Sequence, residues 1–278
     1  MLEKTEFERW IKASHTMFEI FEGRFDAYPL AVKWIEEWFN LGEFTIQDEH
    51  KNRILALQKN FDYGVYGVTG HLKETIDKQF TSLVENHLKK GKSENAGFAV
   101  SPYLFTWNFQ RFKEYFTRRR DFSLELYFSK LGNLLEVERE KLQSFREKKL
   151  LCDQIDKAQV TTIFEGLNSE LKGLGINNNE PIGTAKLLHV CSPFFFPLID
   201  NEIAKALTLL PPKGESLTSK LYLEWMESLK IWLQNYEMIE NLEKEAQSSI
   251  LKLVDEGLYI MCSIKLRYRV GRLGLRVN

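Results

Sequence analysis

The chain has 278 residues and a formal net charge of −1, which excludes a global electrostatic attraction to nucleic acid or to an anionic membrane. Hydrophobic residues make up 44% of it and charged residues 28%, a balance that excludes a disordered chain and is typical of a protein with a substantial core. A site for a polyanion would therefore have to be a local patch of positive charge.

The cysteines are too widely spaced for a C-x-x-C pair or a disulfide framework, and they are Cys152, Cys191 and Cys262. This spacing favours a reducing compartment, and three cysteines are too few to ligate an iron–sulfur cluster. The first ten residues are charged and lack the apolar core of a signal peptide, and no apolar run reaches about 18 residues. We therefore expect a cytoplasmic, soluble protein that holds no cofactor.

Helical periodicity dominates the chain. In Ala31–Phe39 the apolar side chains recur at spacings of three and four residues, and residues 72–90 repeat this pattern. Residues 122–151 are typical of a nearly continuous amphipathic helix, and residues 219–236 carry the clearest apolar stripe. Each of these segments predicts an α-helix.

Period-2 alternation is scarce. It occurs in Tyr63–Thr69 and in residues 264–277, where it predicts short strands or an extended arm. Breaks between the helical segments fall at Gly91–Ala96, Gly173–Pro181 and Pro211–Ser216. None of them is long enough or biased enough to be a flexible linker. The sequence therefore predicts an all-α fold for residues 1–278, as one compact unit or as two helical lobes with a cleft between them.

Two basic clusters stand out from this nearly neutral chain. One ends a predicted helix that starts near Tyr103 and interleaves aromatic and basic side chains; the other is the C-terminal tail, residues 262–278, which contains no acid. Their cations include Arg118, Arg119 and Arg120 in the first cluster and Lys265, Arg267 and Arg269 in the second. Both clusters could contact phosphate groups. The alternative for the first is the stabilisation of a helix C-terminus by positive charge.

The stretch from Ile182 to Leu207 carries most of the functional signal. Gly183 and Thr184 open a short apolar helix, and an apolar run then leads to Asp200 at the start of another helix. An aspartate in this place can cap backbone N–H groups, and it can also point a carboxylate from an apolar wall into a cleft, which suits a catalytic group. Asp200 is therefore the candidate catalytic residue, with helix capping as the structural alternative.

Residues 170–210 resemble the helix-hairpin-helix DNA glycosylase superfamily. There, a glycine-containing hairpin leads into an apolar helix, and a loop with a Pro-Val-Asp-like segment precedes a further helix. Here Leu174–Gly183 would be the hairpin and Thr184–Val190 the helix, and Asp200 would be the aspartate. The pattern K-L-L-x4-P-x3-P-x2-D of uncharacterised bacterial relatives fits from Lys186 to Asp200, through Pro193 and Pro197.

The resemblance implies a DNA-binding protein of the DNA repair type that cleaves the N-glycosidic bond of a damaged base. It implies that the Asp200 carboxylate stabilises positive charge on the sugar or activates a water molecule. The nucleophilic lysine of bifunctional members would fall near Ile182 or Gly183, neither of which can form a Schiff base. The expected activity is therefore monofunctional, without lyase chemistry.

The expected DNA contacts combine the hairpin with the basic clusters: Gly183, Thr184, Lys186, Arg118, Arg119, Arg120, Lys265, Arg267 and Arg269. The backbone N–H groups at the start of the hairpin's second helix would bind a phosphate, which the acidic Glu180 would oppose. A surface lysine whose stem covers apolar groups is the alternative for Lys186. The aromatic helices 103–116 and 219–236 could wall a pocket for an extruded base, or pack in the core.

Two other functions remain open. One is a catalytically inactive helix-hairpin-helix-like module that binds nucleic acid or protein. The other is a helical scaffold unrelated to nucleic acid. Missing phosphate-loop, dinucleotide-binding and G-x-S-x-G motifs disfavour nucleotide hydrolysis, dinucleotide redox chemistry and serine hydrolase chemistry.

The histidines predict no metal site. His189 lies inside an apolar helix, where a core position is expected ahead of a catalytic one. The others show no metal-ligand spacing with one another or with the cysteines, and they are His15, His50, His71 and His87.

Overall fold

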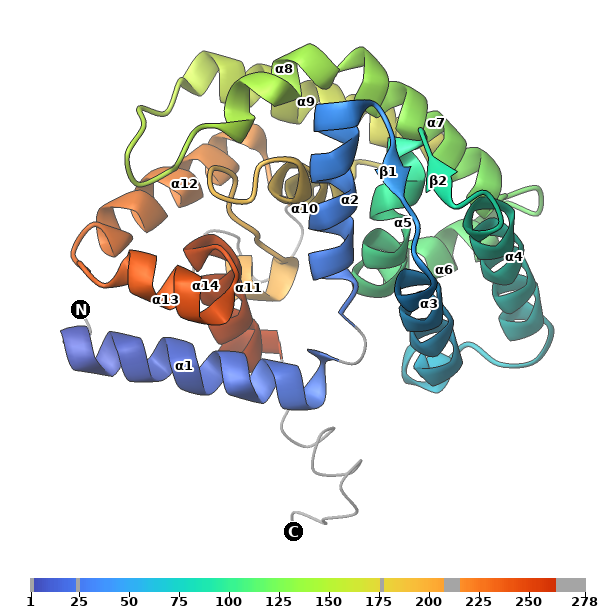
Figure 1. Cartoon of the computed structure of the whole chain (residues 1–278), viewed down its shortest axis with the longest axis horizontal. Coiled ribbons are helices and arrows are strands. Elements are labelled where there is room, and N and C mark those ends of the chain that lie inside the picture. Colours follow the sequence, from blue (N-terminus) through green and yellow to red (C-terminus); the bar gives the residue numbers. More distant parts are fainter. Residues whose placement is uncertain (1–2, 24–25, 176–177, 208–215, 264–278) are drawn as a thin grey trace, which may run out of the picture. The chain divides into compact units, whose positions relative to one another are not determined.

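Fourteen α-helices account for most of the structure, a computed structural model that describes residues 3–23, 26–175, 178–207 and 216–263 (Figure 1). Only two short strands accompany them in these ranges. The predicted all-α class is therefore confirmed. Across the described ranges, no helix combines the length and the apolar character that a membrane crossing requires.

The contacts within the chain define two units. Unit 1 consists of residues 1–23, 148–161 and 193–278, and unit 2 consists of residues 24–147 and 162–192. The boundary passes through the long helix α9 (Lys157–Leu174), whose first residues belong to unit 1.

Unit 2 contains most of the helices. In chain order its elements are α2 (Tyr28–Leu41), β1 (Phe44–Thr45), α3 (Asp48–Asn60), the 3-10 helix η2 (Tyr63–Tyr66), α4 (Gly70–Leu88), β2 (Lys92–Ser93), α5 (Ala96–Trp107), α6 (Phe109–Arg118), α7 (Leu124–Val137), α8 (Arg139–Arg146), the rest of α9 and α10 (Pro181–Cys191). The strands β1 and β2 pair antiparallel, with Phe44 opposite Ser93.

The core of unit 2 is built around α5, which packs between α2 and α7 (Figure 1). Its residues from Ala96 to Thr106 are all buried, and the Asn95 side chain caps its start by accepting the N–H groups of Gly97 and Phe98. A Cβ atom at Gly97 would lie 1.9 Å from the carbonyl oxygen of Phe128, so α5 and α7 cross with their backbones in contact. Only glycine fits this crossing.

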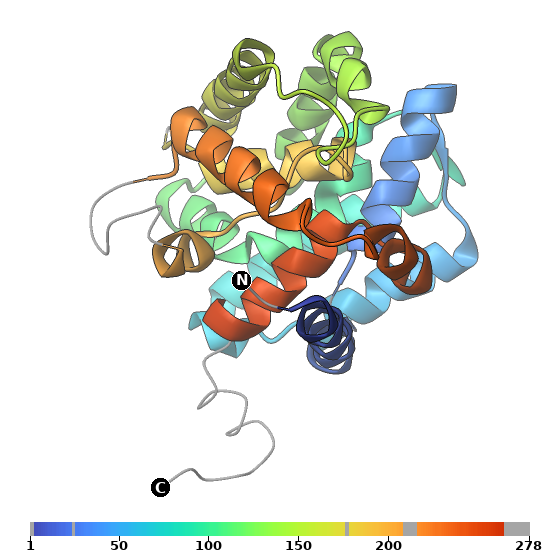
Figure 2. The ribbon, with the colours of Figure 1, turned by 90° about the vertical axis from the view of Figure 1, so that its left-hand side faces the viewer.

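Unit 1 contains α1 (Lys4–Phe21), the start of α9, α11 (Asn201–Ala206), α12 (Ser219–Leu233), α13 (Ile239–Ala246), α14 (Ile250–Leu258) and the π-helical turn η3 (Tyr259–Ser263). Helix α1 packs along α14, and Figure 2 shows α1 nearly end-on beside it. The side chains of Phe7, Ile11 and Phe18 form the buried stripe of α1. Phe7 stacks on Tyr236 with ring centroids 3.8 Å apart.

Most of the predicted helices are confirmed, with shifted ends. Residues 31–39 lie in α2, residues 72–88 in α4 and residues 219–233 in α12. The continuous helix predicted over residues 122–151 is instead two helices, α7 and α8, which break at Glu138.

Two further expectations are wrong. Tyr63–Thr69 contains no strand, because the Asp62 side chain accepts the N–H of Gly64 and Gly67 takes a left-handed conformation (φ 65°), which closes a 3-10 turn. The helix predicted from Tyr103 to Arg120 is divided at Asn108 into α5 and α6. The predicted strand or arm at residues 264–277 lies outside the described residues.

Candidate functional site

Helix α10 is a core helix of unit 2. It starts at Pro181, whose missing N–H costs nothing at a first helical position, and it packs against α2, α5 and α8. His189 is fully buried, its Nε2 lies 2.9 Å from the hydroxyl oxygen of Tyr28, and the two rings stack. The expected core position of His189 is confirmed.

The segment after α10 is held by α12 of unit 1. Its apolar side chains Phe195, Phe196, Leu198 and Ile199 are buried. The Tyr222 hydroxyl donates a hydrogen bond to the carbonyl of Pro197 (2.9 Å), and the indole N–H of Trp225 donates to the carbonyl of Leu198 (3.1 Å). The aromatic side chains of α12 that make these bonds therefore pack in the core and fix the backbone just before Asp200.

Asp200 is half-buried and caps α11. Its Oδ1 accepts the backbone N–H of Ile203 at 2.7 Å, so the predicted cap is confirmed. The thiol of Cys262 lies near enough that the Asp200 charge adds to burial in raising the pKa of that thiol. The carboxylate thus has a defined orientation at the end of a buried apolar segment.

The connection between α9 and α10 turns its acidic side chain inward. Glu180 is only 4% exposed; its Oε1 accepts the Tyr115 hydroxyl at 2.6 Å and lies 2.9 Å from Nε of Arg111. Burial raises the pKa of Glu180 to about 7, against the opposing effects of Tyr115 and Arg111. The carboxylate that was expected to oppose a bound phosphate is therefore buried and paired.

The start of this connection is fixed by α6. A Cβ atom at Gly175 would lie 2.5 Å from the ring of Tyr115, so this glycine permits a close approach of the backbone. Nη1 of Arg119 donates to the carbonyl of Gly175 at 2.8 Å. Arg118 and Arg120, on either side of Arg119, are exposed. Arg119 thus binds backbone at the end of α9, while its two neighbours face solvent.

The residues at the start of α10 are mostly enclosed. Thr184 is fully buried, and both its N–H and its hydroxyl donate to the Glu180 carbonyl (2.8 and 2.9 Å). Gly183 is buried beside Asn108. The half-buried Lys186 donates to the carbonyl of Trp107.

The predicted site residues thus fall into three groups. Gly183, Thr184, Lys186 and Arg118–Arg120 belong to unit 2, and Asp200 belongs to unit 1. Lys265, Arg267 and Arg269 lie outside the described residues.

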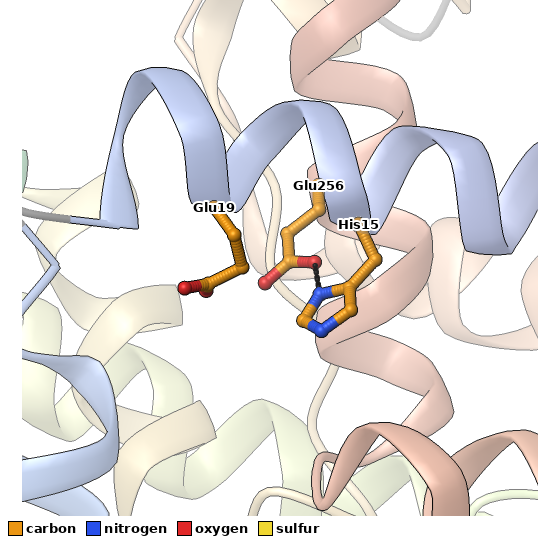
Figure 3. A group of neighbouring side chains, drawn as sticks. All are labelled: His15, Glu19 and Glu256. Atoms are coloured by element: carbon orange, nitrogen blue, oxygen red, sulfur yellow. Dashed lines mark hydrogen bonds and ion pairs between the residues drawn. The ribbon is translucent and has the colours of Figure 1, made fainter.

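Unit 1 also holds a cluster that the spacing of the histidines did not reveal. His15 and Glu19 lie one turn apart on α1, and Glu256 reaches them from α14; one ligand atom of each lies within 4.8 Å of the others. Figure 3 shows the Glu256 carboxylate between the other two side chains. Its Oε2 lies 2.7 Å from Nδ1 of His15. The i, i+4 spacing on α1 was a partial signal, but nothing in the sequence linked it to Glu256.

The imidazole and carboxylates of this cluster could hold a divalent cation. However, the nearly buried ammonium of Lys252 already lies 3.5 Å from Oε1 of Glu256, where its charge competes with a metal. The hydrogen bond to Glu256 raises the pKa of His15. The cluster is therefore better suited to an ion-pair network that joins α1 to α14.

Comparison of the chain with protein families, curated proteins and solved structures found no match.

Proposed function

We propose that the protein is a DNA-binding, helix-hairpin-helix glycosylase-like protein. In this proposal it contacts duplex DNA through the α9–α10 connection, and Asp200 supports monofunctional hydrolysis of an N-glycosidic bond at a damaged base. The observation that carries the proposal is the local order α9, short connection, α10, buried apolar loop and an aspartate that caps α11. This is the order that the resemblance implies for residues 170–210.

The surroundings of the α9–α10 connection support a role in DNA binding. Glu180 is the one acidic side chain described in this connection. It is buried and paired with Arg111, so its charge does not face solvent. Arg119 binds the Gly175 carbonyl, which places the exposed Arg118 and Arg120 next to the connection. Exposed arginines near the end of α9 provide charge for phosphate contacts that carry no base specificity.

The position of Asp200 supports a role in glycosidic bond cleavage. Bond cleavage leaves positive charge on the sugar, and a fixed carboxylate stabilises that charge or accepts a proton from the attacking water. Tyr222 and Trp225 hold the backbone before Asp200, and the cap bond orients the carboxylate. No amine stands at residues 182–183, so a Schiff base with the sugar is not expected there.

Base release from duplexes that carry deaminated, oxidised or alkylated bases tests the catalytic part. Asp200→Asn keeps a good helix cap but loses the charge. Asp156→Asn is the matched control, because Asp156 also belongs to unit 1 and its Oδ1 accepts the N–H of Gln159. After alkali treatment, we expect strand breaks with wild type and Asp156→Asn, and about 100-fold fewer with Asp200→Asn. Equal release by Asp200→Asn would contradict the role of Asp200.

Fluorescence anisotropy with a labelled duplex tests the binding part. We expect Arg118→Ala/Arg120→Ala to weaken binding about tenfold and to reduce the slope of log affinity against log salt by about 2. Lys51→Ala/Lys59→Ala removes the same charge from exposed positions on α3 and serves as the control. Absence of binding by wild type at low salt would refute DNA binding altogether.

A second candidate is a module that keeps this fold without the chemistry. The use of Oδ1 of Asp200 as a helix cap favours it. Salt-dependent duplex binding by wild type, together with no base release from any duplex, would establish this second function and exclude the first.

A further inference from the structure

Unit 2 contains a polar pocket of about 490 Å³ at the ends of α4, β2 and α7. His87 from the last turn of α4, Ser93 from β2 and Glu125 from the first turn of α7 are among the side chains that line it. Strand β2 follows α4 closely in the chain and α7 lies about 30 positions further on, and the pairing of β1 with β2 fixes the position of Ser93.

The imidazole of His87 lies between the other two side chains. Its Nδ1 is 3.4 Å from the Ser93 hydroxyl oxygen, and its Nε2 is 3.4 Å from a carboxylate oxygen of Glu125. The carboxylate favours the tautomer with hydrogen on Nε2, which leaves the lone pair of Nδ1 facing the hydroxyl. Hydrogen bonds in catalytic groups are often this long before a substrate binds.

The hydroxyl of Ser93 is oriented by the backbone. The N–H of Asn95 donates to the Ser93 oxygen at 3.2 Å, so the hydroxyl accepts there and its own hydrogen can turn to Nδ1 of His87. The ring of His87 stacks on Phe98, with centroids 4.2 Å apart and planes at 12°. Nucleophile, base and carboxylate are therefore arranged in the order that activates a serine hydroxyl.

Burial of His87 keeps its imidazole neutral, which is the form that accepts a proton. His87 is 7% exposed, and burial lowers its pKa; Lys90 lowers it further, while Glu125 raises it. Glu125 from α7 and Lys90 from the turn after α4 are the charged groups that act on it. Near neutral pH the imidazole is therefore uncharged, and its Nδ1 can accept a proton.

We propose that Ser93, His87 and Glu125 form a hydrolytic site for small, polar carboxylic esters. The Ser93 oxygen bonds to the ester carbonyl carbon as His87 takes the hydroxyl proton. The C–O bond to the alcohol then breaks, and the alcohol leaves with that proton. Water next adds to the acyl-serine, with His87 as base, and the carboxylic acid leaves as the serine oxygen regains a proton. Glu125 stabilises the transient imidazolium.

The sequence held little signal for this site. The nucleophile does not stand in a G-x-S-x-G turn, and Glu125 lies on another helix, 32 positions after Ser93. Serine–histidine–carboxylate groups occur on unrelated folds in different chain orders, so they are recognised by geometry. The absence of a G-x-S-x-G motif therefore excludes one type of serine hydrolase turn. It does not exclude serine chemistry at Ser93, His87 and Glu125.

A fluorophosphonate probe followed by peptide mass spectrometry tests the proposal on the intact protein. We expect one adduct per chain, on Ser93, and at least about a 100-fold loss of labelling in Ser93→Ala. Ser82→Ala is the control, because Ser82 is an exposed serine on the same helix as His87, and it should label like wild type. Labelling of Ser93 should also fall on acidification as His87 becomes protonated.

A second measurement follows the acyl-enzyme directly, on folded wild type and folded Ser93→Ala. Wild type should give a burst of p-nitrophenol from p-nitrophenyl acetate equal to the protein concentration, and Ser93→Ala should give none. An adduct on a different serine, or neither adduct nor burst from folded wild type between about pH 6 and 9, would overturn the proposal.

Discussion

His15 in unit 1 and His87 in unit 2 each face a glutamate from another helix, yet the pKa of the first is raised and that of the second is lowered. Nδ1 of His15 lies 2.7 Å from Glu256, whose side chain is 3% exposed, whereas the His15 ring itself is 28% exposed. For His87 the burial is reversed: its side chain is 9% exposed, that of Glu125 is 47% exposed, and the contact is 3.4 Å.

The difference shows that a neighbouring carboxylate does not by itself set the charge of a histidine. A buried carboxylate in short contact favours the imidazolium, because water no longer screens the pair. A solvated carboxylate at a longer distance does not outweigh the cost of charging a buried ring. The first pair is therefore suited to joining two helices, and the second to holding a neutral base.

The largest expected effect is on the free energy of unfolding, when each of the two glutamates is replaced by glutamine. Glu256→Gln removes a buried charge between His15 and Lys252, and we expect it to lower the free energy of unfolding by about 3 kcal/mol. Glu125→Gln should lower it by less than about 1 kcal/mol, because Glu125 is half exposed. Urea denaturation followed by circular dichroism measures both, and equal losses would contradict the comparison.

A second prediction concerns the pH dependence of stability. The pKa of His15 is raised in the folded state, so its contribution is complete below about pH 6.5 and is lost as the pH rises through the folded pKa. The pKa of His87 is lowered, so stability is lost as the pH falls below about 6.5 toward the folded pKa.

The contribution of each histidine is obtained by subtracting the free energy of unfolding of a variant that lacks it from that of wild type. The stability difference between wild type and His15→Gln should shrink above about pH 6.5, and that between wild type and His87→Gln should shrink below it. Denaturation series at several pH values give both differences. Differences that shrink in the same direction would mean that the two rings titrate alike.

A third prediction concerns the pKa values of the two histidines themselves, and its expected effect is smaller. In nitrogen-15 NMR titrations, Glu256→Gln should lower the pKa of His15 clearly, because the hydrogen bond to Glu256 is the main cause of its rise. Glu125→Gln should lower the pKa of His87 only slightly, because burial is the main cause of its shift. A His87 pKa that responds as strongly as that of His15 would show that its carboxylate, not burial, controls it.

The smallest expected effect concerns metal. Because Lys252 already neutralises Glu256, added Zn²⁺ or EDTA should change the melting temperature of wild type by less than about 1 °C. A clear rise with Zn²⁺ that disappears in His15→Gln would instead establish a metal site at His15, Glu19 and Glu256.

The sequence predicted the features that depend on residues close together in the chain, such as helices and helix caps. The apolar spacing in residues 31–39 and 219–236 indicated α2 and α12 because each helix buries one stripe of its own residues. Asp200 was predicted as a cap because a cap lies next to the helix that it serves. The break at Asn108 was missed, since aromatic side chains continue on both sides of it.

Contacts between distant segments could not be predicted in this way. Glu180 is acidic and sits in a polar connection, and only the fold shows that Tyr115 and Arg111 bury it. Glu256 follows His15 by 241 positions, and Glu125 reaches His87 from another helix. Such sites depend on helix packing, which a periodicity along one helix does not encode.

Unit 1 combines segments from both ends of the given sequence, and this has a consequence for synthesis on the ribosome. The apolar stripe of α1 is covered by segments made more than 200 residues later, such as α14 and Tyr236, whereas the segments of unit 2 are complete by Ser192. At roughly 5–20 residues per second, α1 waits on the order of 10–50 s for these partners. Nascent chains should therefore expose Phe7, Ile11 and Phe18 to chaperones until these later segments have been synthesised.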